Sequence, residues 1–353
     1  MLLGGLALLL AGANALVRGA SHLAKALGIS PLVVGLTIVA FGTSSPELAI
    51  ATSAAMSGNG ALAIGNVVGS NIANVLLILG LAAVIAPLIV TKRLIRLDVP
   101  FMIVLSLLMY AMASDGSIAR WEGITLFVIA IVYTTFLIRH SRRQPQQEEV
   151  PVEKTGPIRT WRDVLLILAG LAMLILGSKL LVTGAMNIAH ALNVDELIIG
   201  LTVIAIGTSA PEIATTVTAA IKGQREMAIG GVIGSNIFNI LLVLGVASSI
   251  APNPIPVPAS ALAFDIPVMI VVAVACVPIF FTGFKIMRWE GVLFLCYYIA
   301  YTLYLVLLTQ HHEKLPMFSH VLSWYAIPLT AITLSVLCVH AWRKYRAHGH
   351  PKH

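Results

Sequence analysis

Charged residues are scarce in this chain of 353 residues, since Asp, Glu, Lys and Arg together make up 10% of it while hydrophobic residues make up 58%. The chain therefore has too little polar surface to cover a water-soluble globule, and a mean hydropathy of +0.95 indicates an integral membrane protein. The alternating ten-residue pattern of an outer-membrane β-barrel is also absent. We therefore expect an all-α fold, because only helices and closed barrels satisfy their backbone polar groups within a bilayer.

Cysteine is scarcer still. The three cysteines, Cys276, Cys296 and Cys338, all lie in apolar runs, and this odd number predicts no disulfide framework. The chain also lacks a basic stripe interleaved with aromatic residues, which argues against nucleic-acid binding although the formal net charge is +7. Its Lys and Arg residues instead form short clusters between the apolar runs, as expected for topology signals in a lipid bilayer.

The apolar runs predict eleven membrane-spanning helices. Their expected ranges are 2–26, 31–56, 60–86, 98–114, 121–139, 162–190, 196–221, 226–250, 261–283, 289–309 and 321–342. A strongly polar segment separates the first ten into two groups of five. We therefore divide the chain into a first five-helix repeat (1–139), a cytoplasmic linker (140–161), a second five-helix repeat (162–310) and an extra C-terminal helix with a basic tail (311–353).

Two motifs each occur twice in the chain, and both copies are separated by the same shift of 165 residues. GLTIVAFGTSSPE at 35–47 recurs as GLTVIAIGTSAPE at 200–212, and GSNIAN at 69–74 recurs as GSNIFN at 234–239. Because each group has an odd number of helices, the second group must enter the membrane from the opposite side. The repeats are therefore expected to be inverted, an arrangement typical of secondary transporters.

The distribution of Lys and Arg predicts the orientation of the chain. With the N-terminus outside, nearly all the basic residues between spans fall in cytoplasmic loops, and only Arg120 and Lys314 lie outside. We therefore expect a multi-pass protein of the cell (inner or plasma) membrane. The linker and the basic C-terminal tail are expected to lie in the cytoplasm.

Two glutamates, Glu47 and Glu212, lie near the centres of the second and seventh spans. An ionised side chain at that depth is costly unless it is paired or lines a wet cavity, so both are candidate functional residues. Thr43 and Thr208 precede them by four residues, which places each hydroxyl on the same helix face as a carboxylate. A structural ion pair of the glutamates with Arg18 or Lys179 is the alternative.

Each glutamate follows a proline. Pro46 and Pro211 lack an N–H and clash with the carbonyls of Gly42 and Gly207, so they are expected to leave backbone oxygens without their usual helical partners. A simple helix kink is the alternative interpretation.

Serine and asparagine are also four residues apart in the third and eighth spans, as Ser70 with Asn74 and Ser235 with Asn239. Together with the glutamates and threonines they predict a site made of carboxylate, hydroxyl, amide and carbonyl oxygens, without sulfur or imidazole. Such ligands suit a hard cation, Ca²⁺ or Na⁺, and two carboxylates balance one divalent or two monovalent ions. A role for these residues as interhelical hydrogen-bonding groups remains open.

The paired motifs resemble the alpha-repeats of the cation/Ca²⁺ exchanger superfamily, specifically its prokaryotic sodium/calcium exchanger branch, over about the first 310 residues. The resemblance implies a ten-helix antiporter in which helices 2, 3, 7 and 8 form the ion site while helices 1 and 6 slide across them. It implies that Glu47 and Glu212 are shared Ca²⁺ and Na⁺ ligands and that Thr43 and Thr208 give backbone and hydroxyl oxygens. It further implies that the Na⁺ sites are completed by Ser44, Ser209, Ser70, Ser235 and the carbonyls of Ala40 and Ala205.

Two features depart from this resemblance. Asn239 stands where the potassium-dependent branch and some prokaryotic members carry Asp, which argues against potassium cotransport and removes a group that could hold a proton. The eleventh span also has no counterpart in the ten-helix pattern.

The expected function is secondary antiport of Na⁺ for Ca²⁺ by alternating access, with Ca²⁺ and Na⁺ as substrates, the lipid bilayer as surroundings, no cofactor and no evident obligate protein partner. A Ca²⁺/H⁺ or Na⁺/H⁺ exchanger that uses one glutamate as proton carrier is the nearest alternative. A cation channel is disfavoured by the inverted repeats. An enzyme is not expected, because the chain has neither HExxH nor GxGD and its serines lack a membrane-embedded His partner.

Overall fold

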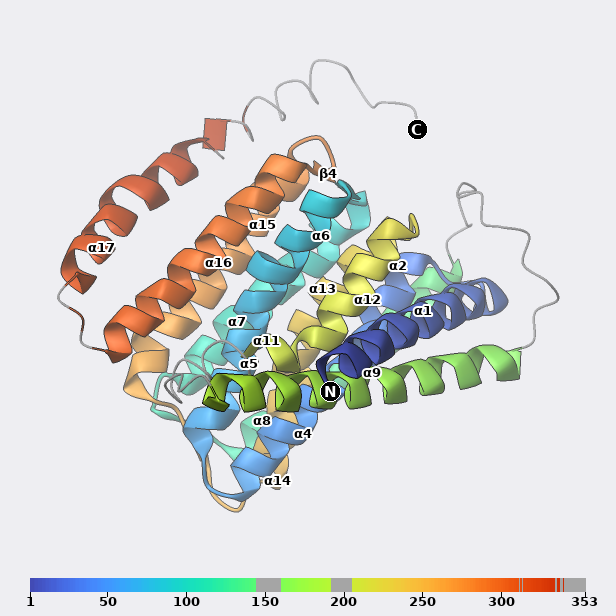
Figure 1. The fold of residues 1–353 in the computed structure, drawn as a ribbon, viewed down its shortest axis with the longest axis horizontal. Helices are drawn as coiled ribbons and strands as arrows, with labels where there is room; N and C mark the ends of the chain where they lie inside the picture. The colour runs from blue at the N-terminus through green and yellow to red at the C-terminus, as the bar shows by residue number, and fades with distance from the viewer. Residues whose placement is uncertain are drawn as a thin grey trace.

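The structure is a computed structural model that describes residues 1–143, 160–191, 205–310, 312, 314–333, 335, 336 and 339 (Figure 1). Nine helices in these ranges are long and apolar enough to cross a membrane, and a pair bent by 47° forms a tenth candidate span. The predicted seventh span begins outside the described residues. Its described part is apolar and helical, so the observed helices agree with the expected all-α membrane protein.

The first half contains five spans. They are α1 (Leu2–Leu27); α2 (Pro31–Val34) with η1 (Gly35–Val39), α3 (Ala40–Thr43) and α4 (Ser45–Met56); α5 (Gly60–Ala73) with η2 (Asn74–Leu79) and α6 (Gly80–Ile85); η3 (Leu94–Asp98) with α7 (Val99–Ala113); and α8 (Arg120–Arg143). The fourth span begins at Leu94, four residues before the predicted start at 98. Arg96 is exposed near the start of this helix, where a long basic side chain can reach the membrane surface.

The second half repeats this order. Its elements are α9 (Thr160–Ala191); α11 (Ala205–Thr208) with α12 (Ala210–Ile221); α13 (Arg225–Phe238) with η5 (Asn239–Leu244) and α14 (Gly245–Ile250); η6 (Ala261–Asp265) with α15 (Ile266–Phe281); and α16 (Arg288–Thr309). The π-helical turns η2 and η5 begin at Asn74 and Asn239, which are equivalent residues of the two repeats. Such turns are frequent at functional sites of membrane helices.

Two short antiparallel strand pairs tie the halves together. β1 (Leu88–Ile89) pairs with β4 (Lys285–Ile286), and β2 (Ser117–Ile118) pairs with β3 (Ile255–Pro256). β1 and β2 lie at opposite ends of the bundle, because the fourth span separates them. β1 and β3 occupy equivalent places after the third and eighth spans, yet they also lie at opposite ends. The two five-helix repeats are therefore inverted, as predicted.

The first spans of the two halves, α1 and α9, pack closely along their length and cross the other helices obliquely (Figure 1). Glycines allow this approach, since a Cβ added at Gly12 would lie 2.8 Å from the carbonyl oxygen of Gly170, and one at Gly5 would lie 2.8 Å from that of Gly177. The order of these contacts makes the pair antiparallel. Close packing through small residues is the usual way for membrane helices to associate.

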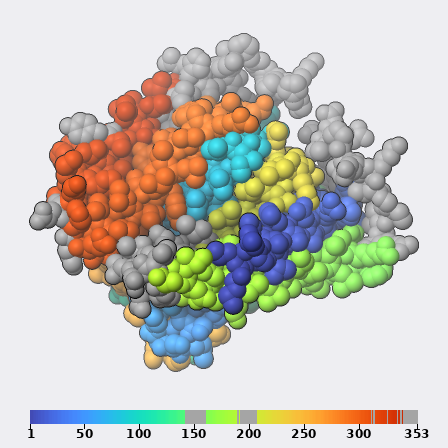
Figure 2. Space-filling view, viewed as in Figure 1, coloured from blue at the N-terminus to red at the C-terminus, as the bar shows by residue number. Residues whose placement is uncertain are grey.

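The eleventh helix packs against α16 at one edge of the molecule (Figure 2). It comprises α17 (Leu315–Val321) and η7 (Leu322–Ala326), and the helical segment extends to Thr333. The Tyr297 hydroxyl of α16 donates to the carbonyl oxygen of Ala326 at 3.0 Å. The predicted start at 321 was six residues late, because Pro316 occupies the first turn of the helix, where proline is well tolerated.

The cysteines agree with the expectation as far as the structure describes them. Cys276 is buried, Cys296 is exposed on the outside of the bundle, and both are free thiols. Cys338 lies outside the described residues.

Candidate ion-binding site

A break in the second and seventh spans places the two glutamates. Ser44 has φ −79° and ψ 5°, and Ser209 has φ −85° and ψ 4°, so each serine forms a turn between two helical segments. Proline follows in the first turn of the next segment, where its missing N–H costs nothing. Glu47 and Glu212 consequently lie in the first turns of α4 and α12, inside the bundle rather than at its ends.

Both carboxylates are buried without a basic partner. Glu47 is 1% exposed and Glu212 is 4% exposed, and the two are near enough to interact electrostatically. Within the described residues, the ion pairs shorter than 4.0 Å are His22–Asp163 and Arg93–Asp98. The alternative of a structural ion pair between a glutamate and Arg18 or Lys179 is therefore wrong.

Hydroxyl groups connect the two halves around these carboxylates. Thr43 ends α3, and its Oγ1 lies 3.5 Å from Oγ of Ser235, a fully buried residue of α13. The Thr43 side chain also lies near enough to Glu212 of the opposite half to interact with its carboxylate. Thr43 is thus close to the glutamate of the other repeat, in addition to sharing a helix face with its own.

A symmetric asparagine network holds the third and eighth spans together. Nδ2 of Asn71 donates to the backbone oxygen of Asn236 at 3.2 Å, and Nδ2 of Asn236 donates to that of Asn71 at 3.3 Å. Each side-chain oxygen of this pair then accepts from a predicted site residue: Asn74 Nδ2 donates to Asn236 Oδ1 at 2.9 Å, and Asn239 Nδ2 donates to Asn71 Oδ1 at 3.0 Å.

This network determines which way the two site amides point. A carbonyl oxygen can only accept, so the side-chain NH₂ groups of Asn71 and Asn236 must point at each other's backbone oxygens. The side-chain oxygens of these two residues therefore face Asn239 and Asn74. The NH₂ groups of Asn74 and Asn239 are therefore used, and their Oδ1 atoms remain buried without a hydrogen-bond partner. Sequence reasoning missed Asn71 and Asn236, although both lie inside the duplicated GSN motif and are 165 residues apart.

Buried oxygens without hydrogen-bond partners are concentrated at the predicted site. Ten buried side-chain polar atoms of the described residues have no partner, and five of them belong to predicted ligands. These five are Ser44 Oγ, Glu47 Oε2, Asn74 Oδ1, Glu212 Oε2 and Asn239 Oδ1. An unsatisfied buried polar group costs about 1–3 kcal/mol, so this concentration indicates groups arranged for a ligand.

The donor set distinguishes among metals. The described residues contain no group of three or more His, Cys, Asp and Glu residues that could hold a metal ion. What remains is two carboxylates with neutral hydroxyl and amide oxygens. This arrangement can bind a hard cation, and it lacks the soft or imidazole ligands that zinc and copper prefer.

The backbone carbonyls differ from expectation in the second half. The Gly207 carbonyl, which Pro211 deprives of its helical partner, accepts a hydrogen bond of 2.6 Å from Ser178 Oγ of α9. Ala40 retains its helical bond, because its oxygen accepts from the Ser44 N–H at 3.0 Å. Ala205 begins α11, and the surroundings of its side chain lie outside the described residues.

A cavity of about 280 Å³ reaches the site from the β2–β3 end of the bundle. Three predicted ligands, Ser70, Thr208 and Ser209, line it. The cavity is also lined by Gly65, Asn66, Gly69, Asp265 and Tyr301. Asn66 also donates to the backbone oxygen of Glu47 at 3.1 Å, so the cavity wall is directly connected to one glutamate.

Comparison with known proteins places the chain in a family. The model of the family described as sodium/calcium exchanger protein matches residues 1–139 and 163–307. The chain belongs to the sodium/calcium exchanger family. It is therefore an exchanger-type antiporter and not an enzyme.

The relatives of this exchanger support the assignment. It is 43% identical to the putative antiporter CaxA of Alkalimonas amylolytica over 255 residues, covering 71% of this chain and 80% of that one. It is 32% identical to the sodium/calcium exchanger MaX1 of Methanosarcina acetivorans over 340 residues, covering 85% and 96%. A solved structure of the sodium-calcium exchanger NCX_Mj superimposes with a TM-score of 0.73 at 32% identity, covering 84% and 95%.

A further relative supports location in the inner membrane. The inner membrane protein YrbG of Escherichia coli is 37% identical over 261 residues, which cover 72% of this chain and 80% of that protein. A multi-pass protein of the inner membrane is consistent with this relative and with the helices described above.

Proposed function

We propose that this exchanger carries Na⁺ and Ca²⁺ in opposite directions by alternating access, normally using the Na⁺ gradient to expel Ca²⁺. The observation that carries the proposal is the set of five buried oxygens without hydrogen-bond partners around two unpaired glutamates. A cation would satisfy these oxygens and neutralise the carboxylates at the same time. MaX1 and NCX_Mj are both named as sodium/calcium exchangers, which supports the choice of ions.

In this proposal the two glutamates are ligands shared by the competing ions. One Ca²⁺ or two Na⁺ balance the charges of Glu47 and Glu212. Binding of Na⁺ therefore displaces Ca²⁺ from the site, and binding of Ca²⁺ displaces Na⁺. The hydroxyls of Thr43, Thr208, Ser70 and Ser235 are proposed as neutral ligands. Further proposed ligands are Ser44, Ser209, Asn74, Asn239 and the carbonyls of Ala40 and Ala205.

We further propose the orientation derived from the basic residues. The N-terminus then lies outside, and the β1–β4 end with the linker and the C-terminal tail lies in the cytoplasm. The cavity beside Asp265 accordingly opens to the outside. No cofactor is required for exchange, since ion gradients supply the driving force.

Exchange of Ca²⁺ for protons is the second candidate. The specific observation in its favour is that Glu47 and Glu212 are both buried and both lack a basic partner, so a shared proton could relieve their mutual repulsion. Asn239 counts against it, because an amide at this position cannot carry the proton that an Asp could carry.

Ca²⁺ uptake into proteoliposomes tests the proposal. Vesicles loaded with Na⁺ are diluted into Na⁺-free medium that contains radioactive Ca²⁺, and we expect uptake that stops when the Na⁺ gradient is abolished. Glu47→Gln and Glu212→Gln are each expected to reduce uptake to the level of empty vesicles. Uptake that follows a pH gradient in the absence of Na⁺ would instead establish the proton-coupled candidate.

Glu122→Gln is the matched control for these variants. Glu122 is also buried, but its Oε2 accepts a hydrogen bond of 2.8 Å from the Ala119 N–H at the start of α8, away from the candidate site. Glutamine retains this acceptor, so Na⁺-driven uptake should persist. The proposal fails if wild-type protein shows no Na⁺-driven uptake, or if the Glu47 and Glu212 variants behave like this control.

A further inference from the structure

Two aspartates occupy equivalent places at opposite ends of the bundle. Asp98 ends η3 and Asp265 ends η6, and each precedes the dipeptide that starts the following long helix. Each carboxylate also accepts a hydrogen bond from an equivalent tyrosine: Tyr133 donates to Asp98 Oδ1 at 3.1 Å, and Tyr301 donates to Asp265 Oδ1 at 2.9 Å. The same hydrogen-bonded Asp–Tyr pair therefore occurs in both repeats.

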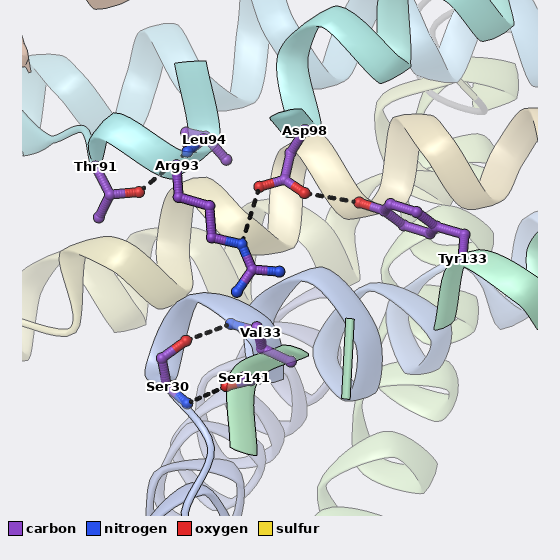
Figure 3. Close-up of polar contacts among 8 residues, drawn as sticks. All are labelled: Ser30, Val33, Thr91, Arg93, Leu94, Asp98, Tyr133 and Ser141. Carbon is purple, nitrogen blue, oxygen red and sulfur yellow. Dashed lines mark hydrogen bonds and ion pairs between the residues drawn. The ribbon is translucent and has the colours of Figure 1, made fainter. Parts of the chain in front are cut away.

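The surroundings of the two carboxylates differ by one charge. Arg93 lies beside Asp98, with Nε 3.9 Å from Oδ2, and both side chains are withdrawn from solvent (Figure 3). The residue that corresponds to Arg93 in the second half is Ser260. Within the described residues, no basic group forms an ion pair with Asp265, which instead lines the cavity that leads to Ser70, Thr208 and Ser209.

The Asp98 end is closed by packing. A Cβ added at Gly234 of α13 would lie 2.8 Å from Ala40 Cβ, and one at Gly230 would lie 2.6 Å from the Leu32 backbone oxygen. The Ser30 N–H at the start of α2 donates to Ser141 Oγ of α8 at 3.0 Å. Figure 3 shows Arg93 extending from Asp98 toward this first turn of α2.

Electrostatics predicts different behaviour at these two ends. A carboxylate on the wall of a narrow aqueous path attracts cations and raises their local concentration, since the surrounding low-dielectric walls focus its field. Arg93 cancels this attraction at Asp98, and a guanidinium does not lose its proton in proteins. The paths from the two ends of the bundle must reach the same ion site, because both repeats contribute to that one site.

We propose that Arg93 is a tethered counter-ion that lowers the attraction of the Asp98 entrance for Ca²⁺ and Na⁺, whereas the Asp265 entrance keeps its charge. The inference rests on the proposed function, because it takes Ca²⁺ and Na⁺ as the ions that use both entrances. Arg93 then influences the apparent affinity for Ca²⁺ at the β1–β4 end, and Asp265 influences it at the β2–β3 end. Neither residue belongs to the predicted ligands, so the proposal assigns both to ion entry rather than to coordination.

Na⁺-driven Ca²⁺ uptake in membrane vesicles of opposite orientation tests the proposal, with the Ca²⁺ concentration varied outside the vesicles. Lys285 of β4 is exposed, so Lys285→Cys with a membrane-impermeant thiol reagent identifies the vesicles that expose the β1–β4 end. Arg93→Gln is expected to lower KM for Ca²⁺ by about threefold to tenfold in these vesicles. The change in the opposite vesicles should stay below about twofold, because the Asp265 entrance is unaltered.

Matched variants separate charge from structure. Asp265→Asn should raise KM by a similar factor, but only in vesicles that expose the β2–β3 end. Arg93→Lys keeps the charge and should keep the wild-type KM. Arg93→Gln combined with Asp98→Asn removes both charges, which avoids a buried unpaired carboxylate, and should also give the wild-type KM.

Salt provides a second readout. In this proposal Arg93 and Asp98 face water when their entrance is open. Raising the choline chloride concentration should then reduce the difference in KM between Arg93→Gln and wild type, because charges that face water are screened over about 10 Å at 0.1 M salt. Equal KM changes on both sides, an unchanged KM, or a salt-independent difference overturns the tethered counter-ion. Absence of Na⁺-driven uptake in the wild type overturns the proposed function instead, so the two failures are distinguishable.

Discussion

The α5 and α13 helices carry the same motif and yet have different surroundings. On α13, Gly230 and Gly234 are pressed against the backbone and side chains of the second span, whereas a Cβ added at Gly65 or Gly69 of α5 would meet no atom within 4 Å in the described part of the chain. The cavity lies on the α5 side. Two nearly identical sequences thus differ in their contacts among the described residues, and the cavity borders α5 rather than α13.

The asparagine network should be equally important in both halves, because its hydrogen bonds are symmetric. Asn71→Ala and Asn236→Ala each leave one site amide without the partner that orients it, and we expect each to weaken Ca²⁺ binding by about 10–100-fold, as is typical for groups that orient metal ligands. Isothermal titration of detergent-solubilised protein measures this. A large effect of one variant and none of the other would contradict equal roles of Asn71 and Asn236 in ion binding.

The glycines should respond unequally. Gly234→Val places new methyl groups against Leu36 and Ala40, so we expect a loss of about 1–3 kcal/mol of stability from overpacking. Gly69→Val projects into the cavity and should leave the thermal unfolding temperature in detergent close to wild type while slowing Ca²⁺ uptake. Equal loss of thermal stability in both variants would contradict this difference in packing between Gly234 and Gly69.

Asn239→Asp should add a pH dependence to exchange when the variant is compared with wild type at each pH. The side chain faces Asn71 Oδ1, which accepts a hydrogen bond, so the new carboxyl group must be protonated to replace the amide donor. Exchange by this variant should resemble wild type at low pH and change by a few-fold as the pH rises. The matched variant Asn74→Asp faces Asn236 Oδ1 and should behave in the same way, and a flat pH profile for both would sink this interpretation.

The smallest expected effect concerns the turns before β2 and β4. Phe284 has φ 54°, a left-handed conformation, where the equivalent turn of the first half has Gly116 with φ 89°. Phe284→Gly should therefore relieve backbone strain, and we expect a gain of at most about 1 kcal/mol in stability. The Phe284 ring also contacts Phe281, so Phe284→Ala is the control that removes the ring and retains the Cβ.

Much of the fold could be predicted because the relevant signals are local or repeated. Long apolar runs indicated the spans, and duplicated motifs indicated the inverted halves and both glutamates. Helix ends were less certain, since Arg96 and Pro316 resemble loop residues yet lie within helices. The roles of Asn71 and Asn236 escaped prediction, because hydrogen bonds between residues 165 apart depend on how two helices cross.

The sequence by itself determined that this is a membrane antiporter of the sodium/calcium exchanger type with one carboxylate from each inverted half, because hydropathy and duplicated motifs are properties of the chain alone. Only the tertiary structure decided which oxygens of Asn74 and Asn239 are left for a ligand, that the described cavity borders α5, and that Arg93 lies beside one of two equivalent aspartates. Both copies of the motif carry nearly the same local information. The differences between them arise from packing and charge contributed by other helices.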